Sequence, residues 1–446
     1  MKTAHHILNK IKNTTFMPML FPSMLLENTR NRAGYPSSFP KAWTQKSCGL
    51  KYRILKHLGY VWISAFCITQ ANAFTLPRQP TKSYECDNCG QLSRESLHDK
   101  WEIANEPLNH NISNVRRSYG YKERISLEQL QHGIIISTQA PGAVVRITPL
   151  QNKSIPELLI KTPGNQLLTV KEASSLYNQD EAFGNHPLAI TKHQTMLQIK
   201  PELGYGKFLL KSKNINAKNS DSYMINVLDK FSITYLQVET DSLHYQYGDK
   251  LTASISLHND ITEYDVNDID ARLVGPQGQV VPLKLTKIKS NEFEGTATLD
   301  SELNDHGENW YLETDVQTEY GQEIIRRSGH TAFSYSIPSA SLMNVKKLSS
   351  KPLTFVATVD VATASRYALQ SVLFQKNGKG EARPIQTSQR AQWLEPGKHV
   401  IQFTFDNSNQ LSEDSLYLGY LRLIDYGQLK TVYQYNQPVK LSQLVD

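Results

Sequence analysis

The sequence predicts an all-β protein of three consecutive β-sandwich-type domains. The clearest evidence is a two-residue apolar period. In Leu251–Leu257 and Trp310–Thr318, apolar side chains alternate with polar ones, as they do in half-buried strands. No helical period interrupts residues 232–335, which favours an immunoglobulin-like sandwich there. A length of 446 residues also suggests about three domains of ~150 residues each.

Residues 1–73 are expected to form a leader, with a signal peptide at about residues 51–73. A basic start precedes the apolar stretch Leu58–Ile68, and Ala71–Ala73 supplies the small residues of a cleavage site. An internal apolar helix or strand is the alternative. Residues 1–50 do not fit a signal peptide, so we hypothesise that translation starts later. We therefore expect a secreted or periplasmic protein with no stable membrane span after the signal is removed.

Charge is unevenly distributed along the chain. Residues 1–73 hold ten Lys or Arg and one acidic residue, which leaves 38 basic against 41 acidic residues, a net charge of −3, in the remainder. A mildly acidic protein has no general electrostatic attraction to nucleic acid or to an anionic membrane. We expect no nucleic acid partner.

Residues 74–132 are expected to form a partly helical N-terminal segment with a C-x-x-C motif. Cys86 and Cys89 are the two cysteines outside the leader. A short-loop disulfide between them suits an oxidising compartment. A thioredoxin-type redox pair and half of a zinc site are the alternatives, although neither a βαβ pattern nor a second ligand pair accompanies the motif.

Helix is expected within residues 92–132. Ser126 is suited to cap Leu127–Gln131, and Gly133 follows the expected helix end. Trp101 and its neighbours, after a polar start, are also assigned to the helical part. A second short helix is expected at Lys171–Tyr177.

Three β domains are expected to follow, over residues 133–229, 230–337 and 338–446. The sequence runs through short apolar segments separated by turn residues, such as Ala140–Ala143 in the first domain. In the central domain Trp310 is expected in the core, facing apolar residues of the other strands. With no cysteine after Cys89, apolar burial has to stabilise this domain.

An acidic cluster in the central domain is the best metal candidate. Its carboxylates lie in and after a predicted loop, where they could converge on Ca²⁺, a cation that prefers oxygen ligands. The cluster lacks the glycine and the spacing of an EF-hand, and a solvated acidic loop is the alternative. No other cofactor is expected. The cluster consists of Asp260, Glu263, Asp265, Asp268 and Asp270.

Tyrosines concentrate in the C-terminal domain. Tyr433 and Tyr435 are two residues apart and share a face of their strand. If that face is exposed, the rings could stack on a sugar or anchor a protein partner. Core and edge packing is the alternative. We expect both rings to be solvent-accessible ligand-binding residues.

No compact catalytic motif is present in the sequence. It lacks a G-x-S-x-G elbow, an H-E-x-x-H helix, a P-loop and a dinucleotide glycine fingerprint. We therefore expect a non-catalytic binding protein that recognises a protein or carbohydrate surface. The alternative is a secreted hydrolase, or its accessory subunit, with a dispersed active site and no catalytic residues assignable from sequence.

The run Gly133–Leu150, with Ser137–Ile147 (STQAPGAVVRI) at its centre, resembles a family of uncharacterised secreted bacterial proteins. Members of that family have a signal peptide, an N-terminal β domain and immunoglobulin-like β-sandwich domains. The resemblance implies this organisation from Phe74 onward, and it implies no catalytic residue. Residues 1–50 depart from the family pattern.

Overall fold

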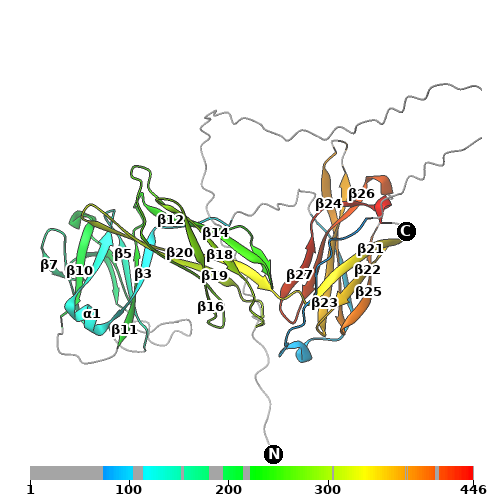
Figure 1. Ribbon diagram of the computed structural model, residues 1–446, viewed down its shortest axis with the longest axis horizontal. Coiled ribbons are helices and arrows are strands. Elements are labelled where there is room, and N and C mark those ends of the chain that lie inside the picture. The colour runs from blue at the N-terminus through cyan, green and yellow to red at the C-terminus, as the bar shows by residue number, and fades with distance from the viewer. Residues whose placement is uncertain are drawn as a thin grey trace, which may run out of the picture. The chain divides into compact units, whose positions relative to one another are not determined.

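The computed structural model describes residues 74–103, 114–151, 155–179, 194–213, 221–303, 306–376, 378, 380–406 and 411–444. The expected leader and its signal peptide at residues 51–73 lie outside this range. Within it, strands dominate and α1 (Leu127–His132) is the one α-helix. The sheets form three β domains, each with its own hydrophobic core, so the all-β prediction is confirmed (Figure 1).

The first domain contains two sheets and α1. Their strand orders are β4-β10-β6-β7 and β3-β11-β5-β9-β8. Inward side chains such as Ile147, Phe208 and Tyr223 form its core. The strands are β3 (Gly120–Ser126), β4 (Ile134–Thr138), β5 (Val144–Pro149), β6 (Leu158–Lys161), β7 (Leu167–Thr169), β8 (Ser174–Gln179), β9 (Thr195–Ile199), β10 (Gly206–Ser212) and β11 (Ser222–Leu228).

The central domain contains two five-stranded sheets, in the orders β17-β18-β14-β12-β2 and β13-β20-β19-β15-β16. Trp310 is 1% exposed and packs against Tyr335 in the same core as Leu251 and Ile255, as predicted. The strands are β2 (Arg116–Ser118), β12 (Tyr235–Thr240), β13 (His244–Gln246), β14 (Lys250–His258), β15 (Asp268–Val274), β16 (Val280–Pro282), β17 (Lys284–Lys289), β18 (Glu292–Thr298), β19 (Trp310–Tyr320) and β20 (Glu323–Ser336).

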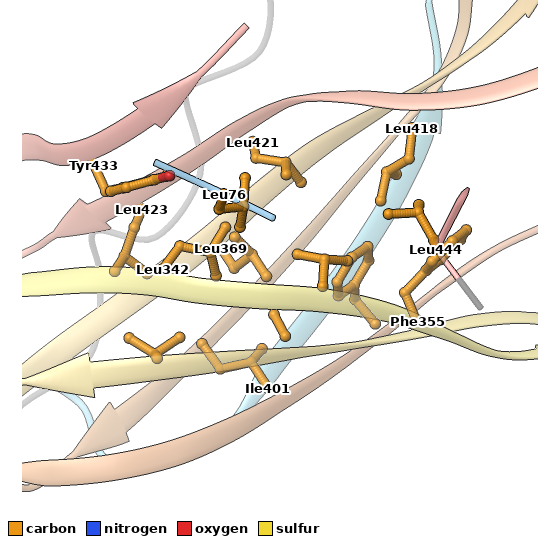
Figure 2. Packing of buried hydrophobic residues seen from close by; sticks show 14 of the residues in the cluster. Leu76, Leu342, Phe355, Leu369, Ile401, Leu418, Leu421, Leu423, Tyr433 and Leu444 are labelled. Atoms are coloured by element: carbon orange, nitrogen blue, oxygen red, sulfur yellow. The ribbon is translucent and has the colours of Figure 1, made fainter. Parts of the chain in front are cut away.

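The C-terminal domain pairs the sheet β1-β24-β23-β26-β27, in which β28 also joins β26, with the sheet β21-β22-β25. Leu76 from the N-terminal segment is buried in its core with Leu421 and Leu423 (Figure 2). The strands are β1 (Leu97–Glu102), β21 (Ala340–Ser350), β22 (Leu353–Val361), β23 (Ser365–Lys376), β24 (Ala382–Leu394), β25 (Gly397–Phe405), β26 (Leu416–Asp425), β27 (Lys430–Tyr435) and β28 (Val439–Lys440).

Short helices complete the described chain. Ser126 caps α1 through a capping box, and Gly133 ends the helix with φ 101°, as predicted. The expected helix at Lys171–Tyr177 is wrong, because β8 begins at Ser174 and pairs with β9. The 3₁₀ helices are η1 (Cys89–Gln91), η2 (Pro201–Leu203), η3 (Glu413–Ser415) and η4 (Leu441–Gln443).

The N-terminal segment contributes one strand to each of the three domains. Strand β1 pairs with β24 of the C-terminal domain, β2 with β12 of the central domain, and β3 with β11 of the first domain. The helical expectation around Trp101 is therefore wrong, because this residue lies in β1. Its strand is held by hydrogen bonds to residues far away in sequence, such as the Trp101–Thr387 pair, which no local pattern reveals.

A buried ion pair joins the first and central domains. Arg327 on β20 and Asp229, just after β11, are each 1% exposed at the side chain, and their Nη2 and Oδ2 atoms are 3.2 Å apart. Arg327 also donates hydrogen bonds to Ser232 and to the carbonyl oxygen of Thr234. Because charges this deeply buried require partners, the pair constrains the junction between the two domains.

Candidate functional site: a groove between the first and central domains

The C-x-x-C motif forms the predicted disulfide. The sulfur atoms of Cys86 and Cys89 are 2.00 Å apart. The pair is less exposed than expected, since Cys89 is buried against the β26–β27 turn. A Cβ at Gly427 in that turn would lie 2.6 Å from the Cys89 sulfur and 2.8 Å from that of Cys86, so this position requires glycine. The disulfide therefore closes a tight loop within the N-terminal segment, and this loop packs against the C-terminal domain at Gly427.

A buried carboxylate lies beside the disulfide. Asp425 accepts hydrogen bonds from the Tyr84 hydroxyl at 2.9 Å and from the hydroxyls of Ser339 and Ser365 at 2.6 Å each. Burial, together with the Asp425 charge, raises the pKa of Tyr84, so this phenol remains a donor. The donors satisfy Asp425 internally, which identifies the cluster as structural support for the segment carrying the disulfide.

The five acidic residues proposed for calcium do not converge. Asp265 pairs with Lys287 at 2.6 Å, Asp270 pairs with Arg272, and Glu263 accepts a hydrogen bond from Ser290. Across the described residues, no group of three or more His, Cys, Asp or Glu side chains could hold a metal ion. The predicted convergence of Asp260, Glu263, Asp265, Asp268 and Asp270 is therefore wrong, and three of these carboxylates have other partners, from Lys287, Arg272 and Ser290.

The two tyrosines share a face of β27, as predicted, but it is the core face. Tyr433 lies among the buried hydrophobic residues of this core, beside Leu76 (Figure 2). It is 3% exposed and donates a hydrogen bond to the carbonyl oxygen of Pro77 at 3.0 Å. Tyr435 is half-buried and packs against Phe74, with ring centroids 5.5 Å apart. The predicted exposure of Tyr433 is therefore wrong, because the N-terminal segment covers this face of the sheet.

A groove of about 640 Å³ lies between the first and central domains, and we take it as the candidate site. Strands β3, β5, β9 and β11 of the first domain line it together with β19 and β20 of the central domain. The backbone N–H of Lys122 on β3 donates to the Ser328 hydroxyl on β20 at 3.1 Å and so links the two walls. Cavities of this size between domains commonly hold ligands.

Three large apolar side chains of the groove lining face solvent. Met196 and Leu228 are each 46% exposed, and Tyr311 is 41% exposed. They lie on the outer faces of their sheets, where polar side chains are the usual choice. The Tyr311 ring lies edge-on to His330, with ring centroids 6.0 Å apart. The groove thus combines aliphatic and aromatic contact surface.

Charged side chains flank this apolar surface. Lys122 of the first domain pairs with Glu313 of the central domain at 3.0 Å, and Arg272 approaches the same carboxylate at 3.1 Å. Burial acts to raise the pKa of Glu313, but the two cations outweigh it and hold that pKa below its usual range. Arg146 is exposed at the groove and forms no ion pair with any described residue. Among the described residues, the groove lining therefore places the unpaired cation of Arg146 beside apolar side chains.

Two serine–histidine contacts in the described chain resemble part of a hydrolase triad. The Ser256 hydroxyl lies 2.7 Å from Nε2 of His258, and the Ser388 hydroxyl 3.2 Å from Nε2 of His98. Within the described chain, no carboxylate accepts a hydrogen bond from Nδ1 of either imidazole. Neither contact therefore forms a Ser-His-Asp triad.

The groove could not be predicted from sequence, because it combines outward residues from two domains. One feature of the sequence does point to it, an apolar residue at an outward position of β11. In β11, Tyr223, Ile225 and Val227 point inward, so Leu228 is an apolar residue at an outward position. An aliphatic residue on the polar side of an alternating strand indicates either an edge or a contact surface.

None of the helices in the described ranges has the length and hydrophobicity needed to cross a bilayer.

Comparison with known families gives three consecutive matches. The models described as DUF4785 N-terminal, central and C-terminal domain match residues 88–229, 232–336 and 339–442. All three are described as domains of unknown function. A search of curated proteins gave no match.

Among solved structures, the chain resembles a DUF4785 family protein from Legionella pneumophila subsp. pneumophila str. Philadelphia 1. The two are 86% identical with a TM-score of 0.75, and the match covers 83% of this chain and 99% of that one. The native alpha-2-macroglobulin of E. coli is 12% identical over 73% of this chain and 20% of that one, with a TM-score of 0.27. A tandem repeat of a large adhesion protein is 12% identical, covers 79% and 83%, and has a TM-score of 0.21. The last two scores are too low to carry an argument.

Proposed function

The chain belongs to the DUF4785 family, and from this premise we propose that it is a non-catalytic binding protein acting outside the cytosol. Its groove between the first and central domains would hold a segment of a protein partner. The proposal extends the expectation of a protein or carbohydrate ligand by favouring protein, for reasons of side-chain chemistry in the groove.

The observation that carries the proposal is the exposed apolar lining. Met196, Leu228 and Tyr311 would lose water contact on binding, and Met and Tyr are enriched at protein interfaces. Sugars stack on aromatic rings but gain little from aliphatic side chains such as Leu228. The free cation of Arg146 adds a contact for an acidic residue of the partner segment.

A location outside the cytosol is supported by two features. The Cys86–Cys89 disulfide is typical of oxidising compartments. Residues 51–73 have the basic, apolar and small-residue order of a secretory signal. Both features agree with a secreted or periplasmic protein.

The groove can be tested with a library of random linear peptides panned against the immobilised full chain. Burying the remaining exposed part of Met196 or Leu228 would contribute about 1 kcal/mol each. The double variant Met196→Glu/Leu228→Glu should therefore weaken an enriched peptide by roughly thirtyfold. A matched control is Leu167→Glu/Ile261→Glu, which changes two exposed apolar residues that do not line the groove.

The outcome decides between ligand classes. Enriched peptides that lose affinity for the groove variant, and keep it for the control, support the proposal. Equal affinity for both variants, or no enrichment at all, contradicts it. Binding of glycans instead of peptides on an array, with the same dependence on Met196 and Leu228, would assign the groove to carbohydrate.

A further inference from the structure

A second cavity lies at the junction of the central and C-terminal domains, away from the groove. Its volume is about 590 Å³, within the range of small-molecule sites. One wall is formed by residues 241–249 of the central domain and the other by β26 and β27. Among the lining residues Leu243 alone is aliphatic, so the cavity is suited to a polar ligand.

An unpaired cation lies on the C-terminal wall. The Arg422 guanidinium forms no ion pair with a described residue, and its buried Nε has no hydrogen-bond partner. It stacks over the Tyr420 ring, 4.2 Å from the centroid. Desolvation by the cavity walls, together with the charges of Arg422 and Lys430, lowers the pKa of His244 on the opposite wall. Arg422 therefore brings a positive charge without an ion-pair partner among the described residues to the C-terminal wall of the cavity.

A β-bulge places Tyr420 beside Arg422. Pairing between β23 and β26 shifts between Gln370–Arg422 and Val372–Gly419, and Tyr420 takes the left-handed conformation with φ 54°. Bulges redirect side chains and are over-represented next to functional sites. A non-glycine residue in this conformation is strained, so the surrounding structure has to hold it there.

Hydrogen-bond acceptors lie on the central-domain wall. Asp241 accepts hydrogen bonds through Oδ1 from the Tyr245 hydroxyl and from the backbone N–H of Thr252. Asp249 accepts through Oδ2 from the N–H of Gln246. The other oxygen of each carboxylate accepts nothing from the described residues. The cavity lining thus combines two carboxylates of the central domain with the guanidinium of the C-terminal domain.

The cavity has a guanidinium on its C-terminal wall and two carboxylates on its central-domain wall. From this arrangement we infer that the cavity binds a small hydroxylated carboxylic acid of the uronic acid type. The planar fork of Arg422 matches a carboxylate bidentately. Hydroxyl groups of the ligand donate to Asp241 and Asp249, and the amides of Gln434 and Asn436 border the same space. A phosphate dianion fits less well, because both Asp charges would repel it.

The test is titration of the purified full chain with D-glucuronate and D-galacturonate, with D-glucose and D-glucose 6-phosphate as comparison ligands, followed by calorimetry. Both uronates should bind at least tenfold more tightly than glucose and glucose 6-phosphate. Arg422→Gln should weaken uronate binding tenfold or more. Arg124→Gln, at an exposed arginine of β3, is the matched control and should leave binding unchanged.

A second variant tests the inference independently, in case Arg422→Gln does not fold. Tyr420→Gly removes the ring under the guanidinium while suiting the positive φ, so its melting temperature should be maintained and its uronate affinity should fall about fivefold. The inference is overturned if neither uronate binds with a Kd below ~10 mM, or if glucose or glucose 6-phosphate binds as tightly as the uronates. It is also overturned if Arg422→Gln or Tyr420→Gly binds uronate with the same affinity as the wild type. Because Arg422 and Tyr420 do not line the groove, peptide binding is independent of this result.

Discussion

Replacing Arg327 by methionine should strongly destabilise the joined first and central domains. The substitution keeps an unbranched side chain but removes the guanidinium. Among the described residues, this leaves the buried Asp229 carboxylate with the backbone N–H groups of Gln139 and Ala140 as its donors. Removing one partner of a buried pair costs about 3–5 kcal/mol. For a cooperative unit of about 200 residues this corresponds to a melting temperature lower by roughly 6–20 °C.

The neighbouring arginine provides a matched control. Arg326 also links the two domains, through Glu123 of β3 at 2.8 Å, but this pair is partly exposed. Partly exposed pairs contribute only about 0–1 kcal/mol, so Arg326→Met should shift the melting temperature by a few degrees at most. The comparison therefore separates the effect of burial from the loss of an interdomain charge.

The assay should resolve individual domains, because a three-domain chain need not unfold in one step. Hydrogen exchange measured by mass spectrometry during thermal unfolding reports on β11 of the first domain and β20 of the central domain separately. Asp229→Asn combined with Arg327→Met should recover part of the loss, since a neutral pair avoids the unpaired buried charge. Equal destabilisation by Arg327→Met and Arg326→Met would refute the reasoning.

The remaining predictions concern pH and the disulfide. Burial lowers the pKa of His98 and of His258 below the ordinary 6.5, so the unfolded chain binds more protons as pH falls. Stability should be complete above pH ~6.5 and fall as pH drops through the lower folded-state values. A His98→Gln/His258→Gln variant should show a flatter melting-temperature profile between pH 7 and 5, and an unchanged slope would contradict the assignment. Cys86 and Cys89 should resist alkylation in freshly isolated protein until reduced, and replacing both by Ser should cost about 2 kcal/mol for their short loop. Immediate labelling of both thiols would count against an oxidising compartment.

The strands of the central domain could be predicted because they satisfy a local rule. Alternation in Leu251–Leu257 reports which side chains share a face, and the burial of Leu251 and Ile255 follows from it. The same rule gave the wrong exposure for Tyr433. Alternation shows that Tyr433 and Tyr435 share a face but not which face is covered, and the covering residues come from the opposite end of the chain.

Two other errors have the same physical origin. The acidic loop is locally plausible for calcium, yet Lys287 of β17 and Ser290 of the turn after β17 contact its carboxylates. The helical expectation at Trp101 failed because β1 exists only through its pairing with β24. The candidate groove and the Arg422 cavity each need side chains from two domains. A sequence pattern within one strand or helix therefore cannot predict the groove or the Arg422 cavity.

The three-way use of the N-terminal segment has a consequence for the order in which the protein folds. Strand β1 precedes every other described strand in sequence, yet the hydrogen bonds of Leu97 can form only when Ala391 is present. The two residues are 391 − 97 = 294 positions apart, so almost the whole chain has to be available before β1 can pair. The first and central domains can meanwhile recruit β3 and β2 from close by in sequence. The C-terminal domain is therefore the last to complete its sheet, which incorporates the strand that precedes all others in sequence. A truncated chain that lacks β24 would retain an unpaired β1, a strand that is paired in the complete chain.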